Sequence, residues 1–553
     1  MKILLTTLNA KYIHKNLALR WLYVANENKE EVTIKEYTIK EDIDIISEEI
    51  IASDFDVVAF STYIWNVEST IEIVKKIKAK TQKHIILGGP EVTYESFHLL
   101  DMGIDALSLG EGEIAFWQYI AMLRRGDNYE IEGIYTKDYP NTTVARVDIK
   151  ANEKWESPYF LEMDKEDMGK RYFYLETSRG CPYSCEYCLS STDQAVRLFS
   201  EDYIFDILVK LSSSKVRIVK LLDRTFNVFP SRALKIARYM NEHCQNQIFQ
   251  FEVVAETLSE EMLTFFCEEA DKNRFRLEIG IQSFHEQTLK SVGRIQNNER
   301  LVEVITRLQE AGIVMHTDLI AGLPHEGIEK FKVSFNRLYG LHTAEIQLGI
   351  LKLLKGTKLK QKQDQYDYYY SEEAPYDILS TRWMNQKELE GLNQCAVAVE
   401  KFYNHGRARK AIDTILELHL YSDAFSLFYD LGQKMKNLKK PYQPWNLFAL
   451  LKELLIHQEE ALIDGILNAD YYRLFKQKPK MYLRDKLNPI IRKEICELFL
   501  KRGIIDTFEM YHYTHIDTIY YQDQLGIQVI LYSNKQTYPR RWFYHDGKIE
   551  EIL

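Results

Sequence analysis

Runs of apolar residues alternate with amphipathic stretches along the first 120 residues of the chain. Short apolar runs predict buried strands, and the helical spacing of apolar residues between them predicts helices. The predicted strands lie at 3–7, 55–63, 84–93 and 103–113. Because strand–helix alternation of this kind is typical of a doubly wound parallel sheet, we expect a Rossmann-like α/β domain over residues 1–136.

The same alternation restarts after a polar stretch at 137–165, which we interpret as a linker. Further strands are predicted at 172–178, 216–223, 249–256, 276–282, 314–322 and 344–353. Six strand–helix repeats are too many for a small open unit and favour a partial or full (β/α) barrel over 166–365. Functional residues are then expected on the loops at one end of that barrel.

From residue 366 the pattern changes to long helical stretches. We expect a mostly helical C-terminal domain over 366–553 that closes with a hairpin at 527–548, whose turn is the sequence SNKQ. Its apolar and aromatic residues, including Trp383, Trp445 and Trp542, are typical of a core. Position alone suggests that this region caps the barrel and selects the substrate.

Composition narrows the class of protein. Of the 553 residues, 46% are hydrophobic and 27% charged, which is ordinary for a soluble globular chain. The formal net charge of −10 argues against a nucleic-acid binder held mainly by phosphate contacts, although a local basic channel stays compatible with it. The sequence predicts no membrane span and no signal peptide. The odd count of seven cysteines fits a reducing, cytoplasmic location.

Three of those cysteines fall within eight positions in the sequence SRGCPYSCEYCLSS, at Cys181, Cys185 and Cys188. A structural zinc site normally has four ligands built from paired halves, and the other cysteines are isolated from one another. A disulfide with one spare thiol is disfavoured in the cytosol. An iron–sulfur cluster fits better, and three thiolates on a [4Fe-4S] cluster leave one iron open to a ligand. The cysteines follow the first predicted barrel strand, so they lie at its catalytic end.

The C-x3-C-x2-C spacing, preceded by Arg-Gly and with an aromatic residue before the last cysteine, resembles the radical S-adenosylmethionine (SAM) superfamily. The resemblance implies that the open iron binds SAM, whose reductive cleavage gives a 5′-deoxyadenosyl radical. Three later stretches, FEVVAETLSEEML, EIGIQSFHEQTLKSVGR and HTDLIAGLPHE, resemble strand motifs of the same superfamily. The SAM contacts that the resemblance implies are Tyr187, Glu252, Gln282, Arg294 and Asp318.

The segment LLDRTFNV matches the second-strand motif only loosely, which makes Asp223 and Asn227 weaker candidates. The Gly-Gly-Glu that usually follows this strand is absent.

The N-terminal domain resembles the cobalamin-binding domain that precedes the radical core in one class of these enzymes. Its glycine pair and LGEGE sequence stand at predicted strand ends, where ligands of parallel sheets bind. The implied cobalamin contacts are Thr62, Gly88, Gly89, Gly110 and Glu111. His14 lacks the Asp-x-His-x-x-Gly context of cobalt-ligating histidines, so we interpret it as a loop histidine.

The resemblance implies cobalamin-dependent methylation of a substrate carbon, with a substrate and an electron donor such as flavodoxin or ferredoxin as partners. A methylthiotransferase is disfavoured because no cysteine precedes residue 181. Two alternatives stay open. One is a radical SAM enzyme without functional cobalamin, and the other is a non-catalytic iron–sulfur redox protein.

Overall fold

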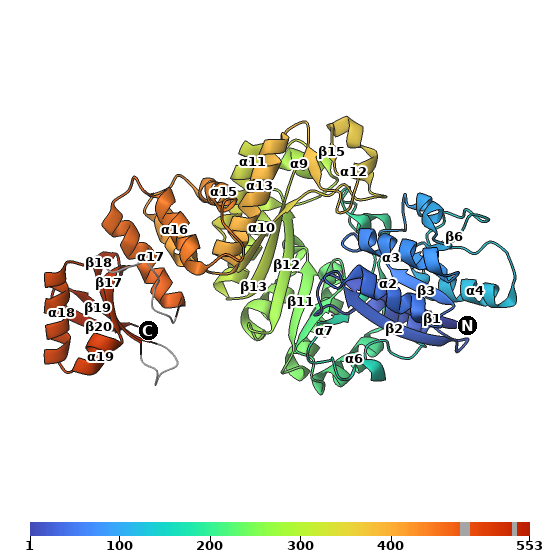
Figure 1. Ribbon diagram of the computed structural model, residues 1–553, viewed down its shortest axis with the longest axis horizontal. Helices are drawn as coiled ribbons and strands as arrows, with labels where there is room; N and C mark the ends of the chain where they lie inside the picture. Colours follow the sequence, from blue (N-terminus) through green and yellow to red (C-terminus); the bar gives the residue numbers. More distant parts are fainter. Residues whose placement is uncertain (476–486, 533–538, 553) are drawn as a thin grey trace. The chain divides into compact units, whose positions relative to one another are not determined.

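The computed structural model describes residues 1–475, 487–532 and 539–552 (Figure 1). The chain forms two compact units, and each is described by itself. The first comprises Met1–Gly327 and Ile350–Gln386, and the second comprises Ile328–Gly349 and Lys387–Leu553. The N-terminal and central sheets both belong to the first unit. The domain boundaries expected from the sequence stay predictions, because this division does not separate those two sheets.

The N-terminal sheet has the strand order β2-β1-β3-β4-β5-β6 and is parallel except for β6. Its strands are β1 (Lys2–Asn9), β2 (Glu31–Thr38), β3 (Val57–Ser61), β4 (His84–Gly88), β5 (Ala106–Ser108) and β6 (Ile134–Tyr135). Its helices are α1 (Leu17–Val24), α2 (Ile43–Ala52), α3 (Val67–Lys80) and α4 (Gly112–Arg125). The expected doubly wound sheet is confirmed. The edge strand β2 was not predicted, since its apolar residues are few and mostly half-buried.

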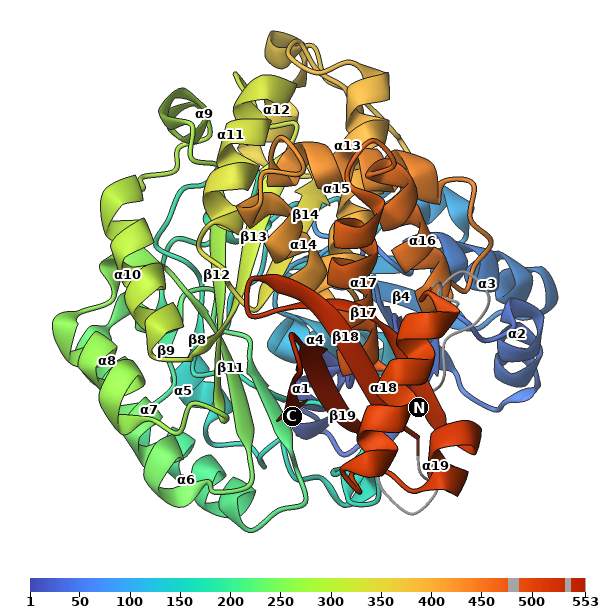
Figure 2. The same cartoon turned by 90° about the vertical axis from the view of Figure 1, so that its left-hand side faces the viewer.

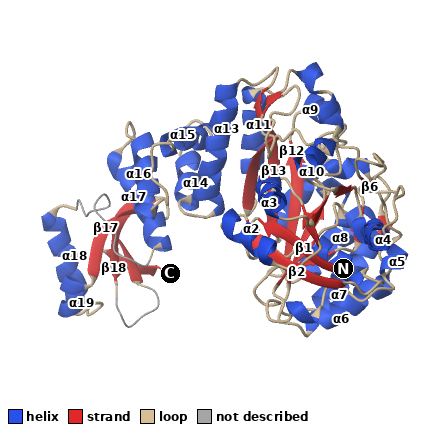
Figure 3. Cartoon of the chain, turned by 45° about the vertical axis from the view of Figure 1, so that its right-hand side comes forward, coloured by secondary structure: helices blue, strands red, loops and turns tan. Residues whose placement is uncertain are grey.

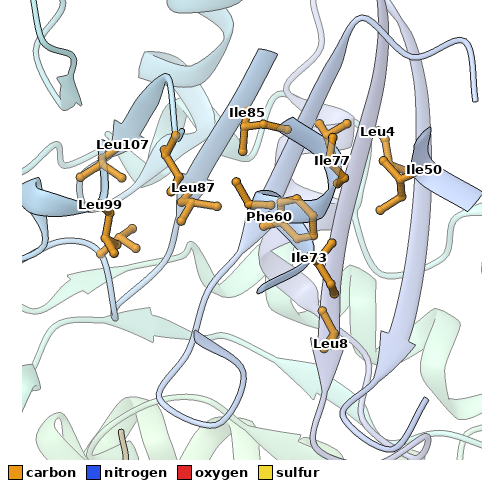
Figure 4. Packing of buried hydrophobic residues seen from close by; sticks show 14 of the residues in the cluster. Leu4, Leu8, Ile50, Phe60, Ile73, Ile77, Ile85, Leu87, Leu99 and Leu107 are labelled. Carbon is orange, nitrogen blue, oxygen red and sulfur yellow. The ribbon is translucent and has the colours of Figure 1, made fainter. Parts of the chain in front are cut away.

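Helices cover both faces of this sheet. Side chains of α2 and α3, such as Ile50 and Ile73, pack with Leu4 and Phe60 on one face (Figure 4). Helices α1 and α4 cover the other face, where Leu5 lies. Because helices cover both faces, β1 and β3 are buried at successive positions rather than at alternate ones.

The central sheet of the first unit runs in the order β13-β12-β11-β10-β7, and every neighbouring pair is parallel. Its strands are β7 (Phe173–Leu175), β10 (Ile218–Leu221), β11 (Ile248–Val253), β12 (Phe275–Gln282) and β13 (Val314–Ala321). Among the described residues no strand pairing closes the sheet into a ring, so the predicted partial barrel, not a full one, is observed.

Residues of the central strands alternate between fully buried and half-buried, most clearly in β11, β12 and β13. The buried set includes Phe249, Phe251 and Phe275. Helices lie along one side of these strands (Figure 2). The helices between the strands are α6 (Glu201–Ser212), α7 (Pro230–His243), α8 (Glu260–Thr264), α9 (Glu286–Ser291) and α10 (Asn298–Glu310). The half-buried set is mainly polar and forms what we call the inner face, comprising Tyr174, Lys220, Gln250, Glu252, Arg276, Glu278, His316 and Asp318.

A strap formed by residues 350–386 belongs to the same unit. It contains α12 (Lys358–Gln361), β15 (Tyr369–Tyr370) and β16 (Ile378–Ser380). Tyr376 donates a hydrogen bond to the buried carboxylate of Glu91, and the Lys355 ammonium lies 3.1 Å from the same carboxylate. Further along, Lys362 pairs with Glu186 at 2.7 Å. The strap therefore joins a loop of the N-terminal sheet to the segment that carries the three cysteines.

The second unit contains helices and an antiparallel sheet in the order β17-β18-β19-β20 (Figure 3). Its elements are α11 (Ile328–Tyr339), β14 (Glu345–Ile350), α13 (Gln386–Ala398), α14 (Arg409–Glu417), α15 (Ala424–Met435), α16 (Pro444–Leu454), α17 (Glu460–Leu474), α18 (Pro489–Lys501), α19 (Thr507–His512), β17 (Thr514–Tyr521), β18 (Gln524–Leu531), β19 (Arg540–His545) and β20 (Lys548–Ile552). The predicted terminal hairpin corresponds to β18 and β19, and its SNKQ turn lies outside the described residues.

Helices α18 and α19 pack on one face of that sheet, where Phe499 meets Trp542. None of the described helices combines the length and the apolar character that a bilayer-spanning segment requires.

Candidate active site

A short two-stranded ribbon frames the loop that carries the three cysteines. Strand β8 (Ser178–Arg179) pairs with β9 (Arg197–Leu198). At Gly180 the backbone has φ of +93°, and a Cβ there would lie 2.4 Å from the carbonyl oxygen of Ala195. The amide of Cys181 donates to the carbonyl of Asp193 at 2.9 Å. Only glycine fits at this position, so the Arg-Gly noted before the first cysteine has a steric cause.

The side chains of Cys181 and Cys185 are buried, and that of Cys188 is half-buried. Burial raises the pKa of the Cys181 thiol, which lies 3.9 Å from the hydroxyl of Thr225. No three His, Cys, Asp or Glu side chains in the described part of the chain are arranged around one metal ion. The assignment of the three thiolates to an iron–sulfur cluster therefore stays a prediction.

Asp223 fastens the start of the ribbon. This fully buried carboxylate, two residues beyond β10, accepts hydrogen bonds from the amide of Thr177 at 2.8 Å, its hydroxyl at 2.5 Å and the hydroxyl of Ser178 at 2.6 Å. Burial raises the pKa of Asp223. Asn227 makes a similar clamp to the main chain of Val254, donating at 2.9 Å and accepting at 3.0 Å. Both weaker candidates therefore hold strand ends in place.

Arg294 lies next to the cysteine loop. Its guanidinium donates to the carbonyl of Gly280 and, at 2.8 Å, to the side chain of Gln296, and it lies 3.5 Å from the hydroxyl of Tyr187. Burial raises the pKa of the Tyr187 hydroxyl, and the Arg294 charge opposes this. The amide of Glu186 donates to the carbonyl of Val292, which ties the two segments together. The structure thus brings Tyr187 and Arg294 to the cysteine loop.

Gln282 has a strained backbone at the end of β12. Its φ is +68°, and the strand register shifts between Gly280 and Gln282. A Cβ at Gly280 would lie 2.3 Å from Nε2 of the Gln282 side chain, so glycine leaves space for that side chain. The buried Oε1 of Gln282 has no hydrogen-bond partner among the described residues. A strained backbone and an unsatisfied side-chain acceptor in the same residue are typical of a ligand-binding position.

Three carboxylates gather near the carboxyl ends of the central strands. Glu252 lies opposite Glu278 in the β11–β12 register, and Asp318 lies opposite Gly280 in the β12–β13 register. Burial raises the pKa of Glu252 to about 7, which Arg224 opposes and Glu278 and Asp318 reinforce. The ring of His316 lies 3.1 Å from Asp318. This end of the inner face is therefore acidic and suited to a ligand with cationic or hydroxyl groups.

Glu256 is a further acidic residue, in the short helix η5 (Ala255–Thr257) that follows β11. Both carboxylate oxygens are buried, and neither accepts a hydrogen bond from another described residue. Burial raises the pKa of Glu256, and the nearby Arg294 charge opposes this. Glu256 lies in one of the quoted motifs, FEVVAETLSEEML, but it was not predicted as a site residue.

The five predicted cobalamin contacts lie at strand ends of the N-terminal sheet, namely Thr62, Gly88, Gly89, Gly110 and Glu111. Thr62 is fully buried, and its amide donates to the carbonyl of Gly88 at 2.7 Å. Gly89 and Gly110 have positive φ, and a Cβ at either would approach the main chain of Thr62 or Ala145 to within 2.6 Å. Chain packing thus explains these glycines, and the predicted cobalamin contacts stay predictions.

Aromatic side chains stand at the same edge of the N-terminal sheet. Tyr63 and Trp65 follow β3 and stack with ring centroids 4.4 Å apart, and Trp65 is 46% exposed. His14, in the loop after β1, contacts the hydroxyl of Tyr174 through Nδ1 at 2.6 Å. Burial, reinforced by Lys220, lowers the pKa of His14. The loop after β1 therefore reaches the inner face of the central sheet, and its histidine favours the neutral form.

Two arginines next to the cysteines join the two sheets. Arg179 donates to Glu113 at 2.7 Å and to Glu176 at 3.1 Å. Arg197 makes a two-pronged pair with Glu111 at 2.7 and 2.8 Å. Because Glu111 and Glu113 lie at the start of α4, the cysteine ribbon is bonded directly to the N-terminal sheet domain. The contact was not predicted, since partners 66 and 86 residues away in sequence leave no local signal.

Three family models match successive parts of the chain. The B12 binding domain matches residues 3–120, the Radical SAM superfamily matches 175–338, and a family described as protein of unknown function (DUF4080) matches 364–541. The chain therefore contains a B12-binding domain in front of a radical SAM domain. The resemblance identified from the cysteine spacing is confirmed.

Curated relatives match part of the chain. The chain is 30% identical over 204 residues to the cobalamin-dependent radical SAM methyltransferase TokK of Streptomyces tokunonensis, covering 34% of this chain and 30% of that protein. It is 29% identical over 203 residues to 2-(S-pantetheinyl)-carbapenam-3-carboxylate methyltransferase of Streptantibioticus cattleyicolor, again covering 34% of this chain and 30% of that protein. The matches thus span under a third of each relative.

Solved structures share the fold over more of the chain. The cobalamin-dependent SAM radical enzyme OxsB, with aqua-cobalamin and SAM bound, aligns with a TM-score of 0.60 at 16% identity, covering 92% of this chain and 82% of that one. The radical SAM methyltransferase TsrM from Kitasatospora setae aligns with a TM-score of 0.56 at 15% identity, covering 66% and 78%. At these identities the likeness shows the fold alone.

Proposed function

We propose that this chain, a radical SAM protein with an N-terminal B12-binding domain, is an enzyme that methylates a substrate carbon with the help of cobalamin. Cys181, Cys185 and Cys188 would hold a [4Fe-4S] cluster, with Tyr187, Glu252, Gln282, Arg294 and Asp318 around SAM. The observation that carries the proposal is the cysteine loop itself. It stands at the carboxyl end of an open half-barrel and is bonded through Arg179 and Arg197 to the B12-binding domain.

When bound, a [4Fe-4S] cluster supplies the single electron that cleaves SAM to methionine and a 5′-deoxyadenosyl radical, and cobalamin supplies a methyl carrier. The chain's own residues would bind SAM and orient it. Gln282 presents an unsatisfied acceptor, and Glu252 and Asp318 present carboxylates to a ligand on the inner face. The helices over the buried set of side chains exclude water from the opposite face of the sheet. A small reduced protein such as flavodoxin or ferredoxin would deliver the electron.

A second candidate is a radical SAM enzyme without functional cobalamin. Thr62 is buried, Gly89 is explained by packing and the Glu111 carboxylate is occupied by Arg197, so none of these residues presents a free polar group at the strand ends. The names of the matched relatives and the exposed ring of Trp65, which stacks on Tyr63, favour the first candidate.

Anaerobic reconstitution of the full chain tests both candidates. Wild-type protein should contain about four irons per chain, bind cobalt as cobalamin and release 5′-deoxyadenosine from SAM with a chemical reductant. The triple variant Cys181→Ala, Cys185→Ala, Cys188→Ala should lose iron and product. Cys267→Ala is the matched control, because that half-buried thiol lies outside the cysteine loop and hydrogen-bonds to the Arg307 carbonyl.

Iron retained by the triple variant, or an intact cluster that never cleaves SAM, would contradict the radical proposal. Cobalt at the background level, together with normal release of 5′-deoxyadenosine, would contradict the first candidate and support the second.

A further inference from the structure

The inner face of the central sheet separates its charged side chains into rows. In the strand register Lys220 lies opposite Gln250, and Gln250 lies opposite Arg276, so these residues form one row across β10, β11 and β12. Two residues nearer the carboxyl ends of the strands, Glu252 and Glu278 form the next row. Because two residues of a parallel strand span about 7 Å, a cationic row and an acidic row lie side by side on one face.

The two cations of the first row have no counter-charge. Among the described residues, neither the Lys220 ammonium nor the Arg276 guanidinium forms an ion pair or a hydrogen bond, and Nε of Arg276 is buried. The Lys220 ammonium lies over the ring of Tyr172, 5.1 Å from its centroid, and Gln250 donates to Glu278 in the next row. A partly buried cation without a partner costs free energy, so the row is complementary to an anionic ligand.

The spacing of the two cations indicates which anion fits. Lys220 and Arg276 lie two strands apart, which places their Cα atoms about 10 Å from each other. Side chains of their length can reach one group from both sides. A guanidinium binds two oxygens of an oxyanion, and an ammonium adds a point charge. Two positive charges match a phosphate monoester, which carries about −1.5 to −2 charges at neutral pH, whereas a carboxylate would leave one cation unmatched.

The two cofactors of the proposed enzyme do not supply this group. SAM carries a sulfonium, and its expected contacts Gln282 and Asp318 lie at the carboxyl ends of the strands. The predicted cobalamin contacts lie on the N-terminal sheet. The cationic row is therefore left for the substrate.

We propose that Lys220 and Arg276 bind a phosphate group of the substrate and hold the rest of that molecule toward the acidic row. The assignment rests on the proposed function and names the substrate class, a phosphate monoester. Its reacting carbon lies on the side of the phosphate that faces the expected SAM contacts.

Inorganic phosphate is a probe that requires no knowledge of the whole substrate. The full chain, reconstituted with iron and sulfide, would be titrated anaerobically by calorimetry with phosphate and with acetate at constant ionic strength. Wild-type protein should bind phosphate at least about 10-fold more tightly than acetate. Arg276→Gln and Lys220→Gln should each weaken phosphate binding about 10-fold or more, because each removes a charged donor.

Arg217→Gln is the matched control, since it removes the same charge from an exposed residue directly before β10. It should bind phosphate as wild type does. The melting temperature in phosphate-free buffer separates binding from a structural role. Removal of an unpaired cation should leave this temperature equal or higher, whereas a cation that stabilises the acidic row would lower it when lost.

Four results would overturn the assignment. They are a wild-type protein that binds no phosphate, variants that bind it normally, acetate that binds as tightly as phosphate, and a clear fall in melting temperature in both variants. Loss of cobalamin from either variant would also overturn it, because the row would then bind the phosphodiester of that cofactor. Phosphate binding through Lys220 and Arg276 in a protein that never cleaves SAM would instead contradict the proposed function, so the two failures differ.

Discussion

The two parallel sheets of the first unit bury their side chains in different ways. In the N-terminal sheet Leu4 and Leu5, adjacent on β1, are both fully buried because helices cover both faces. In the central sheet Phe251 is buried while its neighbour Gln250 is half-buried and polar. The first sheet therefore has only its edge for a ligand, whereas the second offers a whole face. Alternation within a parallel strand, where continuous apolar runs are usual, marks that face.

The largest expected effect is on stability, and it tests whether the two sheets differ in how their faces are covered. Leu4→Ala and Leu5→Ala should each lower the stability of the first unit by about 2–5 kcal/mol, because each leaves a cavity on a covered face. Phe251→Ala should cost about 3–5 kcal/mol, but Gln250→Ala only about 1 kcal/mol. Chemical denaturation of the four variants measures the difference. Similar losses for Phe251→Ala and Gln250→Ala would mean that the central sheet is covered on both sides.

In both sheets a buried polar side chain forms hydrogen bonds to the ends of strands. The second test compares the loss of these two side chains. Asn66 donates to the hydroxyl of Thr7 and to the carbonyls of Leu8 and Ser61, as Asp223 accepts from its three donors. Asn66→Ala and Asp223→Ala should each destabilise by about 3 kcal/mol, since buried partners lose their bonds. Only Asp223→Ala should also lower the iron content after reconstitution. Equal iron in the two variants would show that Asp223 does not position the cysteine loop.

Glycine geometry at the edge of the N-terminal sheet gives a smaller effect. Gly89→Ala combines φ of +105° with a Cβ 2.6 Å from the Thr62 carbonyl oxygen, so we expect a loss of about 2 kcal/mol. Gly126→Ala is the control, because φ there is +71° with no atom within 4 Å of the added Cβ, and about 1 kcal/mol is expected. Melting temperatures of both variants check the order. A reversed order would mean that the loop after β4 moves easily.

The smallest expected effect is the pH dependence of the stability that Glu252 contributes. It tests whether the inner face of the central sheet is acidic. Its pKa of about 7 in the folded chain exceeds the ordinary 4.5, so folding favours the protonated form. This contribution is complete below pH 4.5 and is lost as pH rises through about 7. The side chain is 39% exposed, and screening reduces the difference to about 1 kcal/mol. Glu252→Gln should be more stable than wild type at pH 8 and equal to it at pH 4.5. Parallel pH profiles for the two proteins would contradict the acidic inner face.

Most of the architecture could be predicted because apolar runs and helical spacing are local signals. They gave the strands of both sheets, apart from the polar edge strand β2 and the two-residue strand β6. The cysteine spacing gave the candidate site. In the second unit the pattern gave the strand at 344–353, the long helical stretches and the terminal hairpin. Strand β17 was missed because its first four residues are all buried, three of them polar, so no alternation marks it.

Glu256 was missed for a different physical reason. Its carboxylate is buried without a hydrogen-bonding partner among the described residues, and contacts between distant segments leave no pattern in the sequence. The same holds for Arg179, whose partner Glu113 belongs to another sheet domain. Residue types at strand ends could be predicted, but their remaining hydrogen-bonding capacity could not.

The strap at 350–386 bears on how the molecule can be divided. It supplies Tyr376 and Lys355 to Glu91 and Lys362 to Glu186, whereas the radical SAM family match ends at residue 338. A fragment cut at that family boundary would leave the buried Glu91 carboxylate without either partner and would free one side of the cysteine segment. Expression of the first two domains alone therefore needs the chain to run through residue 386.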